Sequence, residues 1–222
     1  MLGLIFRDTD KGIDRGIIQW SKPARGVDVM LERLREIILE KAFEYADEPI
    51  FTLANAEKSN FYFNCKPVVL DPEGAEIVSR LVFDRIKDLS VSAVGGLELG
   101  AVPISSMITL VSQLKGKPIK GFIVRKKSKD HGIPTKIEGL LAAGEKVVIV
   151  DDVITTGKST IEAIEAVKKV GANVEKVVIL VDREEHDGKQ NIQKYCADVE
   201  ALVTRTEIMD LYRSANIQKK AV

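Results

Sequence analysis

The sequence is poor in cysteine, in aromatic residues and in long hydrophobic runs. Only Cys65 and Cys196 are cysteines among 222 residues, which excludes a disulfide scaffold, leaves at most one disulfide and gives no metal or redox spacing. The longest aliphatic run, Val177 to Val181, is far shorter than the roughly 20 residues that a transmembrane helix needs. The apolar start, Leu2 to Phe6, runs at once into charged residues and does not resemble a signal peptide. We expect a cytoplasmic protein without membrane association.

The sequence also lacks an excess of charge of either sign. Lys+Arg 33 and Asp+Glu 33 cancel to a net charge of 0. Bulk charge therefore favours neither a nucleic acid nor a membrane surface as partner. A polyanionic ligand would have to be bound by a local cluster of cations.

Short apolar strands alternate with helices along most of the chain, a pattern typical of βαβ units around a buried parallel sheet. A glycine-rich turn is expected at 95–100, and a long exposed loop at 126–138. Because ligands of such sheets bind at the carboxyl ends of the strands, functional residues are expected there. Strands are predicted at 61–65, 91–94, 119–124, 146–150, 177–181 and 199–203, and helices from residue 28, from 72, over 103–114, around 161–170, over 189–196 and over 206–214.

The segment Val147 to Ser159 carries the strongest functional signal. Two carboxylates, Asp151 and Asp152, follow an aliphatic strand, and a turn of threonine, glycine and serine leads into a helix. Amides, hydroxyls and a helix N-terminus that converge on one point favour a phosphate, and the carboxylates can accept hydrogen bonds from sugar hydroxyls. A nucleotide-binding P-loop would need glycine where Asp152 stands. The remaining alternative is a plain helix cap; the arrangement favours a sugar 5-phosphate.

The predicted loop after residue 124 contains a dense group of cations. Arg125, Lys126, Lys127, Lys129 and His131 lie within seven residues. Positioned cations, together with Mg²⁺, would stabilise the charge that develops on a departing pyrophosphate. We expect the segment to close over substrate. A solvated charged loop or a nucleic-acid contact is the alternative.

These two segments resemble a known family. Residues 147–159 resemble the phosphoribosyl-pyrophosphate (PRPP) signature of type I phosphoribosyltransferases, and residues 125–139 resemble the catalytic loop of the orotate phosphoribosyltransferases. The resemblance implies an α/β type I phosphoribosyltransferase fold, with a central parallel sheet flanked by helices and a small N-terminal hood. Residues 1–26 would be an N-terminal extension, 27–70 an N-terminal helix and the hood segment, and 71–222 the PRPP-binding α/β core.

The resemblance also implies an activity and its partners. The reaction would transfer the phosphoribosyl group of PRPP to orotate, giving orotidine 5′-phosphate and pyrophosphate in UMP synthesis. Mg²⁺ would be the cofactor, bound mainly through PRPP, with no metal held by the protein alone. The enzyme would be a homodimer in which the catalytic loop reaches into the partner subunit's site.

Residue roles follow from the same resemblance. Lys129 would be the foremost catalytic cation, and Arg183 would bind the orotate carboxylate through two parallel hydrogen bonds. Aromatic packing remains the alternative for Tyr62 and Phe63, and a surface salt bridge for Arg183. The implied catalytic residues are Arg125, Lys129, His131 and Asp152; the PRPP-binding residues are Arg125, Lys126, Lys129, His131, Asp151, Asp152, Val153, Ile154, Thr155, Thr156, Gly157, Lys158 and Ser159; the orotate-binding residues are Tyr62, Phe63, Thr155 and Arg183.

Two positions depart from the family's pattern. Ala54 stands where many members have a lysine, and Leu99 stands where many have the lysine of a tyrosine-lysine pair. Lys58 or Lys66 could replace the missing charge. The alternatives are therefore a phosphoribosyltransferase for another base, or a PRPP-sensing regulator without catalysis. Arg183 and the intact cationic loop favour the orotate enzyme.

Overall fold

The structure is a computed structural model, and it describes residues 26–52, 57–127 and 136–220. A six-stranded sheet lies at its centre, in the order β10-β9-β8-β5-β6-β7. Five strands are parallel, and the edge strand β7 runs antiparallel to β6. The prediction of a central parallel sheet is therefore confirmed. The strands are β5 (Ala93–Leu97), β6 (Lys120–Val124), β7 (Ile137–Gly139), β8 (Lys146–Ile154), β9 (Asn173–Asp182) and β10 (Val199–Thr204).

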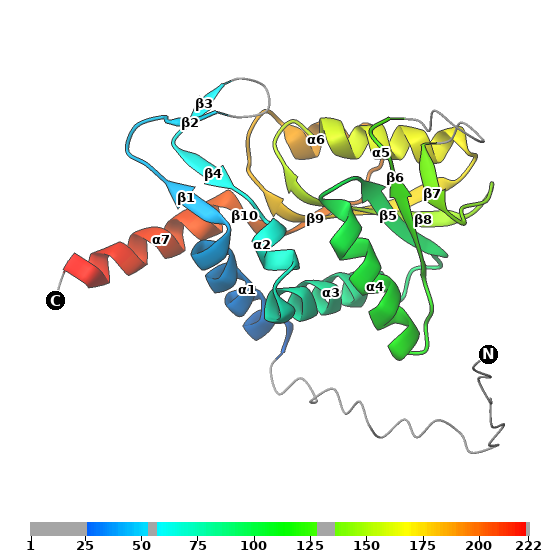
Figure 1. The fold of residues 1–222 in the computed structure, drawn as a ribbon, viewed down its shortest axis with the longest axis horizontal. Coiled ribbons are helices and arrows are strands. Elements are labelled where there is room, and N and C mark those ends of the chain that lie inside the picture. The colour runs from blue at the N-terminus through cyan, green and yellow to red at the C-terminus, as the bar shows by residue number, and fades with distance from the viewer. Residues whose placement is uncertain (1–25, 53–56, 128–135, 221–222) are drawn as a thin grey trace, which may run out of the picture.

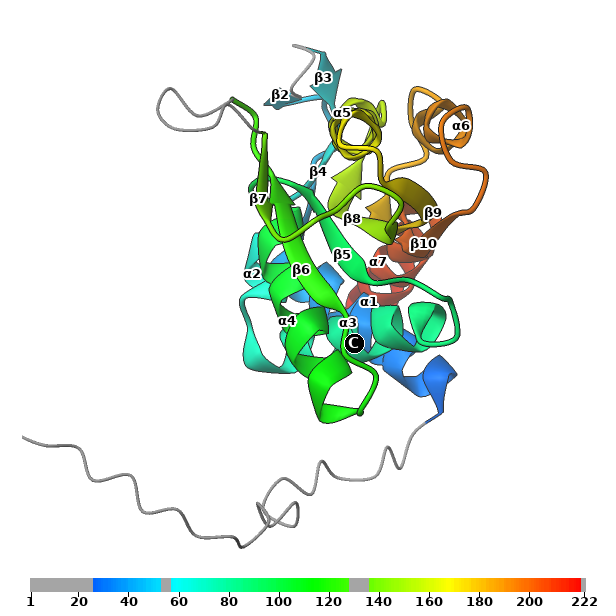
Figure 2. The same cartoon turned by 90° about the vertical axis from the view of Figure 1, so that its right-hand side faces the viewer.

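Helices cover both faces of the sheet (Figures 1 and 2). The residues of β8 alternate between the two faces, as in any strand. Val147 and Ile149 pack in a core with α5, whereas Val148 and Val150 pack in a second core with α1, α3 and α4. The helices are α1 (Val27–Lys41), α2 (Lys66–Val69), α3 (Pro72–Ile86), α4 (Ala101–Leu114), α5 (Lys158–Lys169), α6 (Gly188–Gln193) and α7 (Arg205–Lys220).

Two short antiparallel strand pairs form the hood, which we define as β1 to β4. Strand β1 (Phe43–Tyr45) pairs with β4 (Phe61–Phe63), and β2 (Phe51–Thr52) pairs with β3 (Lys58–Ser59). The buried residues of α1 and of the hood belong to the same apolar core as one face of the sheet. The hood is thereby fixed to the α/β core by shared packing.

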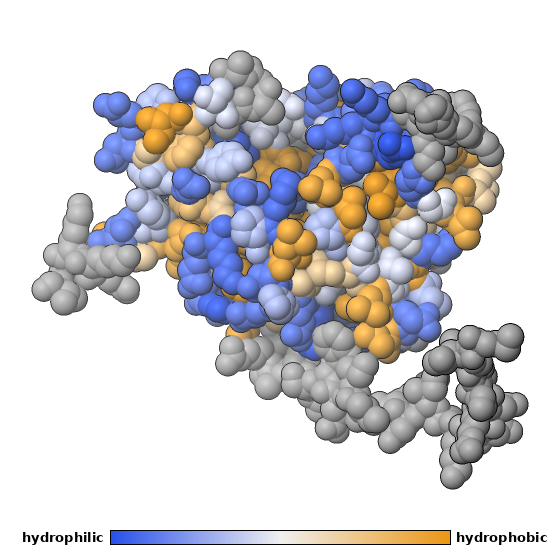
Figure 3. All heavy atoms as spheres, in the orientation of Figure 1, coloured by the Kyte–Doolittle hydropathy of each residue, from blue (hydrophilic) through white to orange (hydrophobic). Residues whose placement is uncertain are grey.

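The surface and the cysteines show no unusual feature. On the face drawn in Figure 3, hydrophobic residues lie in small groups among hydrophilic ones. Cys65 and Cys196 are both buried and free, as packing residues would be. In the described ranges, no helix is long and apolar enough to cross a membrane.

Three local predictions are wrong. Gly95 and Gly96 lie inside β5 and not in a turn, because they pair with Phe122 and Ile123 of β6. Glycine allows this close packing, since a Cβ on either would come within 2.2 Å of a carbonyl oxygen of a neighbouring strand. Strand β8 continues to Ile154, four residues beyond the predicted end, because β9 offers it a partner as far as Asp182. The predicted loop at 126–138 ends in strand β7, which pairs with β6.

Candidate active site

The two aspartates of the acidic pair lie within β8, so their side chains point to opposite faces of the sheet. Asp151 lies on the α5 side and is 5% exposed. Its Oδ2 accepts a hydrogen bond from Thr160 Oγ1 at 2.8 Å, and its Oδ1 accepts one from the Asp152 N–H at 3.0 Å. Asp152 lies on the other side, where Lys66 Nζ is 3.5 Å from its Oδ2. Of the pair, Asp152 is the carboxylate that remains accessible to a ligand.

Burial controls the protonation of Asp151. Desolvation is the largest effect, and with the charge of Asp152 it raises the pKa of Asp151 to about 7. The hydrogen bond from Thr160 acts in the opposite direction, since it favours the ionised form. Asp151 is therefore a buried carboxyl group that titrates near neutral pH.

The segment after β5 lies directly against Asp152. A Cβ added to Gly100 would come 2.1 Å from Asp152 Oδ1, so only glycine allows this approach. Glu98 belongs to the same turn, and its Oε1 accepts a hydrogen bond from the Lys126 N–H at 2.8 Å. This turn therefore connects the acidic pair to the start of the cationic loop.

The predicted phosphate turn is braced by helix α6. Gly157 is the N-cap residue of α5, with a φ of +78° and no side-chain hydrogen bond of its own, while the Lys158 N–H donates to Thr156 Oγ1 at 3.4 Å. A Cβ on Gly157 would come 2.7 Å from the Gly188 carbonyl oxygen, and Asn191 Nδ2 donates to the Thr156 carbonyl at 3.2 Å. The exposed Lys158 and Ser159 follow at the start of the helix. The turn leaves the positive end of α5 open to an anion.

Val153 and Ile154, two of the predicted PRPP-binding residues, lie at the end of β8 and not in the turn that follows it. Ile154 is 2% exposed, and its carbonyl oxygen accepts the Arg183 N–H at 3.1 Å. Val153 is partly buried and packs against the apolar core. The backbone hydrogen bond to Arg183 brings the end of β9 next to the phosphate turn.

The structure describes the beginning and the end of the cationic loop. The Arg125 N–H donates to the Lys136 carbonyl at 2.7 Å, and its guanidinium lies 3.5 Å from Glu138. Lys126 is exposed. Lys129 and His131, the other two predicted ligands of PRPP, lie outside the described residues.

The hood places its two predicted base-binding residues on opposite faces of β4. Phe63 is 5% exposed, and its ring centroid lies 5.0 Å from that of Phe43 in the core. Tyr62 is exposed and stacks on Phe51 at 6.0 Å between ring centroids. The side chain of Tyr62 is therefore free to meet a ligand, whereas that of Phe63 packs in the protein interior.

Arg183 follows β9 and is 4% exposed, so a surface salt bridge is the wrong description. Its guanidinium carbon lies 5.0 Å from the Phe61 ring centroid, and its Nη2 lies 2.9 Å from Glu185 Oε2. Burial lowers the pKa of Arg183, although the charge of Glu185 opposes this effect. Arg183 is thus a buried cation between the hood and the end of the sheet.

Several residues of the site carry no signal in the sequence. Their roles depend on contacts between segments that the sequence separates. These residues are Thr160 beside Asp151, Glu185 beside Arg183, and Gly188 and Asn191 beside the predicted phosphate turn. Of the two lysines that could replace the missing charge, Lys66 lies beside Asp152.

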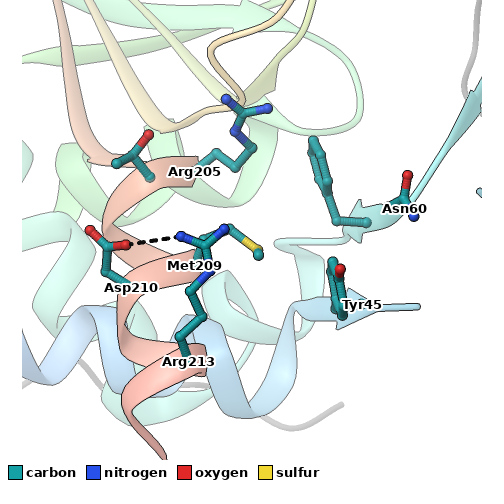
Figure 4. Close-up of a pocket in the computed structure, with 8 residues that line it drawn as sticks. Tyr45, Asn60, Arg205, Met209, Asp210 and Arg213 are labelled. Atoms are coloured by element: carbon teal, nitrogen blue, oxygen red, sulfur yellow. Dashed lines mark ion pairs between the residues drawn. The ribbon is translucent and has the colours of Figure 1, made fainter. Parts of the chain in front are cut away.

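A separate cavity of about 320 Å³ lies between the hood and helix α7. Figure 4 shows residues of the hood facing those of α7 across it. The Arg205 guanidinium, which lines it, lies against the Phe61 ring at 5.2 Å. None of the predicted ligands of PRPP or orotate lines this cavity, which is formed by Tyr45, Asn60, Phe61, Arg205, Thr206, Met209, Asp210 and Arg213.

The carboxyl ends of β5, β8 and β9 therefore bring together a carboxylate, a close glycine turn, an open helix N-terminus and a buried arginine. The family model of the phosphoribosyl transferase domain matches residues 69–208 of the chain, which contain most of this site. Fold and site together define a phosphoribosyltransferase.

Individual relatives narrow the family further. An orotate phosphoribosyltransferase of Rhodopseudomonas palustris is 48% identical over 157 residues, which are 69% of this chain and 82% of that protein. One of Aquifex aeolicus is 39% identical over 183 residues, 82% of this chain and 100% of that protein. The crystal structure of the Mycobacterium tuberculosis enzyme in complex with PRPP has a TM-score of 0.64 and 25% identity, covering 81% of this chain and 92% of that chain. The chain belongs to the orotate phosphoribosyltransferase family, as the sequence motifs indicated.

Proposed function

We propose that the chain transfers the phosphoribosyl group of PRPP to orotate, giving orotidine 5′-phosphate and pyrophosphate in pyrimidine biosynthesis. The observation that carries the proposal is the contact of Gly100 with Asp152, together with the start of α5, whose N-cap residue Gly157 makes no side-chain hydrogen bond. This supports a site in which the carboxylate binds the ribose hydroxyls, backbone amides bind the pyrophosphate and the helix N-terminus binds the 5-phosphate. Arg183 supplies a matched donor for a base that bears a carboxylate.

Within this function, the accessible Asp152 binds the ribose hydroxyls and the buried Asp151 supports the strand end. Residues Thr155 to Ser159 enclose the 5-phosphate. Arg125, Lys126, Lys129 and His131 neutralise the pyrophosphate, with Lys129 foremost. Tyr62, Thr155 and Arg183 hold orotate, and Phe63 contributes through its backbone.

For this reaction the protein has mainly to position the two substrates and to neutralise the charge of the leaving group. Displacement at the anomeric carbon passes through an oxocarbenium-like state, by analogy with glycoside hydrolysis. The site fixes the sugar by its hydroxyls and phosphate and holds the base nitrogen in line with the departing oxygen. Because orotate is already an anion when it attacks, no strong general base is required.

Mg²⁺ fits the donors at this site. It prefers oxygen ligands and keeps several waters, and Asp152 together with the PRPP oxygens offers such a set. When bound with PRPP, the ion would neutralise charge on the pyrophosphate. We propose that the ion binds mainly through PRPP. We also propose that the enzyme is cytoplasmic.

Pyrophosphate release tests the proposed function directly. Purified protein is mixed with PRPP, Mg²⁺ and a single base: orotate, uracil, adenine or none. We expect release with orotate alone. Release with another base but not with orotate would instead identify a sibling phosphoribosyltransferase, and PRPP binding without turnover on any base would identify a sensor.

The cationic loop is tested by two neighbouring substitutions. Lys129→Ala should lower kcat by about 10²-fold or more, because it removes charge stabilisation from the leaving group. Lys127→Ala removes the same charge two residues earlier and should change kcat less than about threefold if position, and not total charge, matters. Equal losses in the two variants would contradict the assignment of Lys129.

We also propose that the enzyme is a homodimer whose cationic loop completes the partner's site. Mixing Lys129→Ala protein with Asp152→Asn protein, assayed at a PRPP concentration low enough that each variant alone has little activity, tests this. A hybrid dimer with a shared loop has one site with both substitutions and one with neither, so activity should return on subunit exchange. Continued inactivity of a mixture shown to contain hybrid dimers would mean that each loop serves its own subunit.

A further inference from the structure

The strongest unexplained feature outside the phosphate site is the ion pair of Arg183 with Glu185. The two side chains are 5% and 19% exposed, and Arg183 Nη2 lies 2.9 Å from Glu185 Oε2. Despite this distance, Arg183 Nε and Glu185 Oε2 have no hydrogen-bond partner among the described residues. The contact is therefore electrostatic, without the geometry of a good hydrogen bond.

The guanidinium is left with one edge incompletely bound. Nε and Nη2 form the edge that a carboxylate can bind with two parallel hydrogen bonds. Here Nη2 has a long hydrogen bond to Ser59 Oγ at 3.5 Å and the contact with Glu185, while Nε has none. A better-placed carboxylate would satisfy both nitrogens.

The loop that carries Glu185 is fixed on both sides of it. Glu184 and His186, its neighbours, have φ values of +53° and +51°, which are uncommon for residues other than glycine. The Glu184 carboxylate accepts the Thr206 N–H at 2.8 Å, and His186 Nε2 lies 2.9 Å from Glu57 of the hood. A conformation of this kind persists where surrounding contacts hold it, and here it turns Glu185 toward Arg183.

We propose that Glu185 is a stand-in for the substrate's carboxylate: it neutralises Arg183 in the empty site and is displaced when a carboxylated pyrimidine binds. A buried guanidinium without an anion would be costly, so the empty site needs such a partner. A neutral pyrimidine cannot replace Glu185, whereas a carboxylate that binds Nε and Nη2 together can. Arg183 then selects the carboxylated pyrimidine, and Glu185 sets how tightly that pyrimidine binds. The inference rests on the proposed function, in which Arg183 binds the carboxylate of orotate.

Binding of two nucleotides that differ only in the carboxylate tests the inference. Calorimetry would compare orotidine 5′-phosphate with UMP on the wild-type protein and on Glu185→Gln, which keeps the shape and removes the competing charge. We expect the Kd of orotidine 5′-phosphate to fall about threefold to tenfold, corresponding to about 0.7 to 1.4 kcal/mol, while the Kd of UMP changes less than about twofold. Glu184→Gln is the matched control, since this neighbouring side chain contacts Thr206 and not Arg183, and the glutamine oxygen can still accept the Thr206 N–H that holds the loop; it should change neither Kd.

An unchanged or higher Kd of orotidine 5′-phosphate in folded Glu185→Gln would overturn the inference, because Glu185 would then position Arg183 without competing. An equal change for UMP would overturn it too. If Glu185→Gln does not fold, Glu185→Asp withdraws the carboxylate by one methylene and should shift the Kd in the same direction. Failure of the proposed function looks different: wild-type protein would release no pyrophosphate from PRPP and orotate.

Discussion

Substitution of Thr160 by valine tests the electrostatic account of the acidic pair. Thr160 is 1% exposed, and its hydroxyl donates to the buried carboxylate of Asp151 at 2.8 Å. Valine has nearly the same shape but cannot donate. The substitution therefore removes a hydrogen bond to a group whose charge depends on pH.

The magnitude follows from the state of Asp151. Its pKa is raised to about 7, so the carboxyl group is neutral in the folded protein at pH 5 and ionised at pH 8.5. Because the pKa of Asp151 is higher in the folded protein than in the unfolded chain, protonation of Asp151 stabilises the fold at low pH. This stabilisation is lost as the pH rises from about 4 to about 7. A hydrogen bond to a neutral group is worth about 0.5 to 1.5 kcal/mol, and one to a charged group about 1.5 to 3 kcal/mol. Thr160→Val should thus lower the unfolding free energy by about 1 kcal/mol more at pH 8.5 than at pH 5.

Urea unfolding followed by far-UV circular dichroism at the two pH values measures this difference. Thr109→Val is the control, since the Thr109 hydroxyl donates at 2.9 Å to the neutral carbonyl of Ser105. Its loss of stability should be the same at both pH values. Equal losses for Thr160→Val at pH 5 and pH 8.5, or a larger loss at pH 5, would refute the proposed titration of Asp151.

Two further predictions concern PRPP binding. Asp152→Asn should raise the KM for PRPP by about tenfold or more, because a charged acceptor for the ribose hydroxyls is lost, and an unchanged KM in steady-state kinetics would contradict the role of Asp152. Gly100→Ala should raise the same KM, because its Cβ would lie 2.1 Å from Asp152 Oδ1 and displace the carboxylate. Gly26→Ala, where a Cβ would meet nothing within 4 Å, is the control and should leave the KM unchanged.

The sheet could be predicted from the sequence because its central strands contain buried aliphatic runs. Runs such as Val147 to Val150 are aliphatic throughout, and each strand of the parallel sheet was expected at the place where one occurs. Their ends were harder to predict, since β8 continues through Asp151 and Asp152 only because β9 pairs with it there. The antiparallel edge strand β7 has three residues and no apolar run that would indicate it.

Candidate site residues could be proposed from the sequence where one short segment holds them together, as in the predicted phosphate turn from Thr155 to Ser159. They were not predictable where the site depends on a contact between distant segments. No local pattern links Glu185 to Arg183 as a buried pair, or places Lys66 within 3.5 Å of Asp152. The position of Lys66 does bear on the departure at Leu99, because it brings a cation to the acidic pair from the hood side of the site.

The separation of Asp151 and Asp152 explains how two adjacent acids can have different tasks. Both would face the ligand if they followed the strand in a turn, and both would then carry charge in water. Because they lie within β8, the two-residue period of the strand buries Asp151 under α5 and leaves Asp152 beside Gly100. The pKa of Asp151 is raised to about 7, so this buried carboxyl group can lose its proton near neutral pH. Asp152 is the carboxylate that we propose binds the sugar. A neutral Asp151 places no second negative charge beside Asp152 when an anionic substrate enters. We therefore expect the affinity for PRPP to fall over the same pH range in which ionisation of Asp151 lowers the stability of the fold.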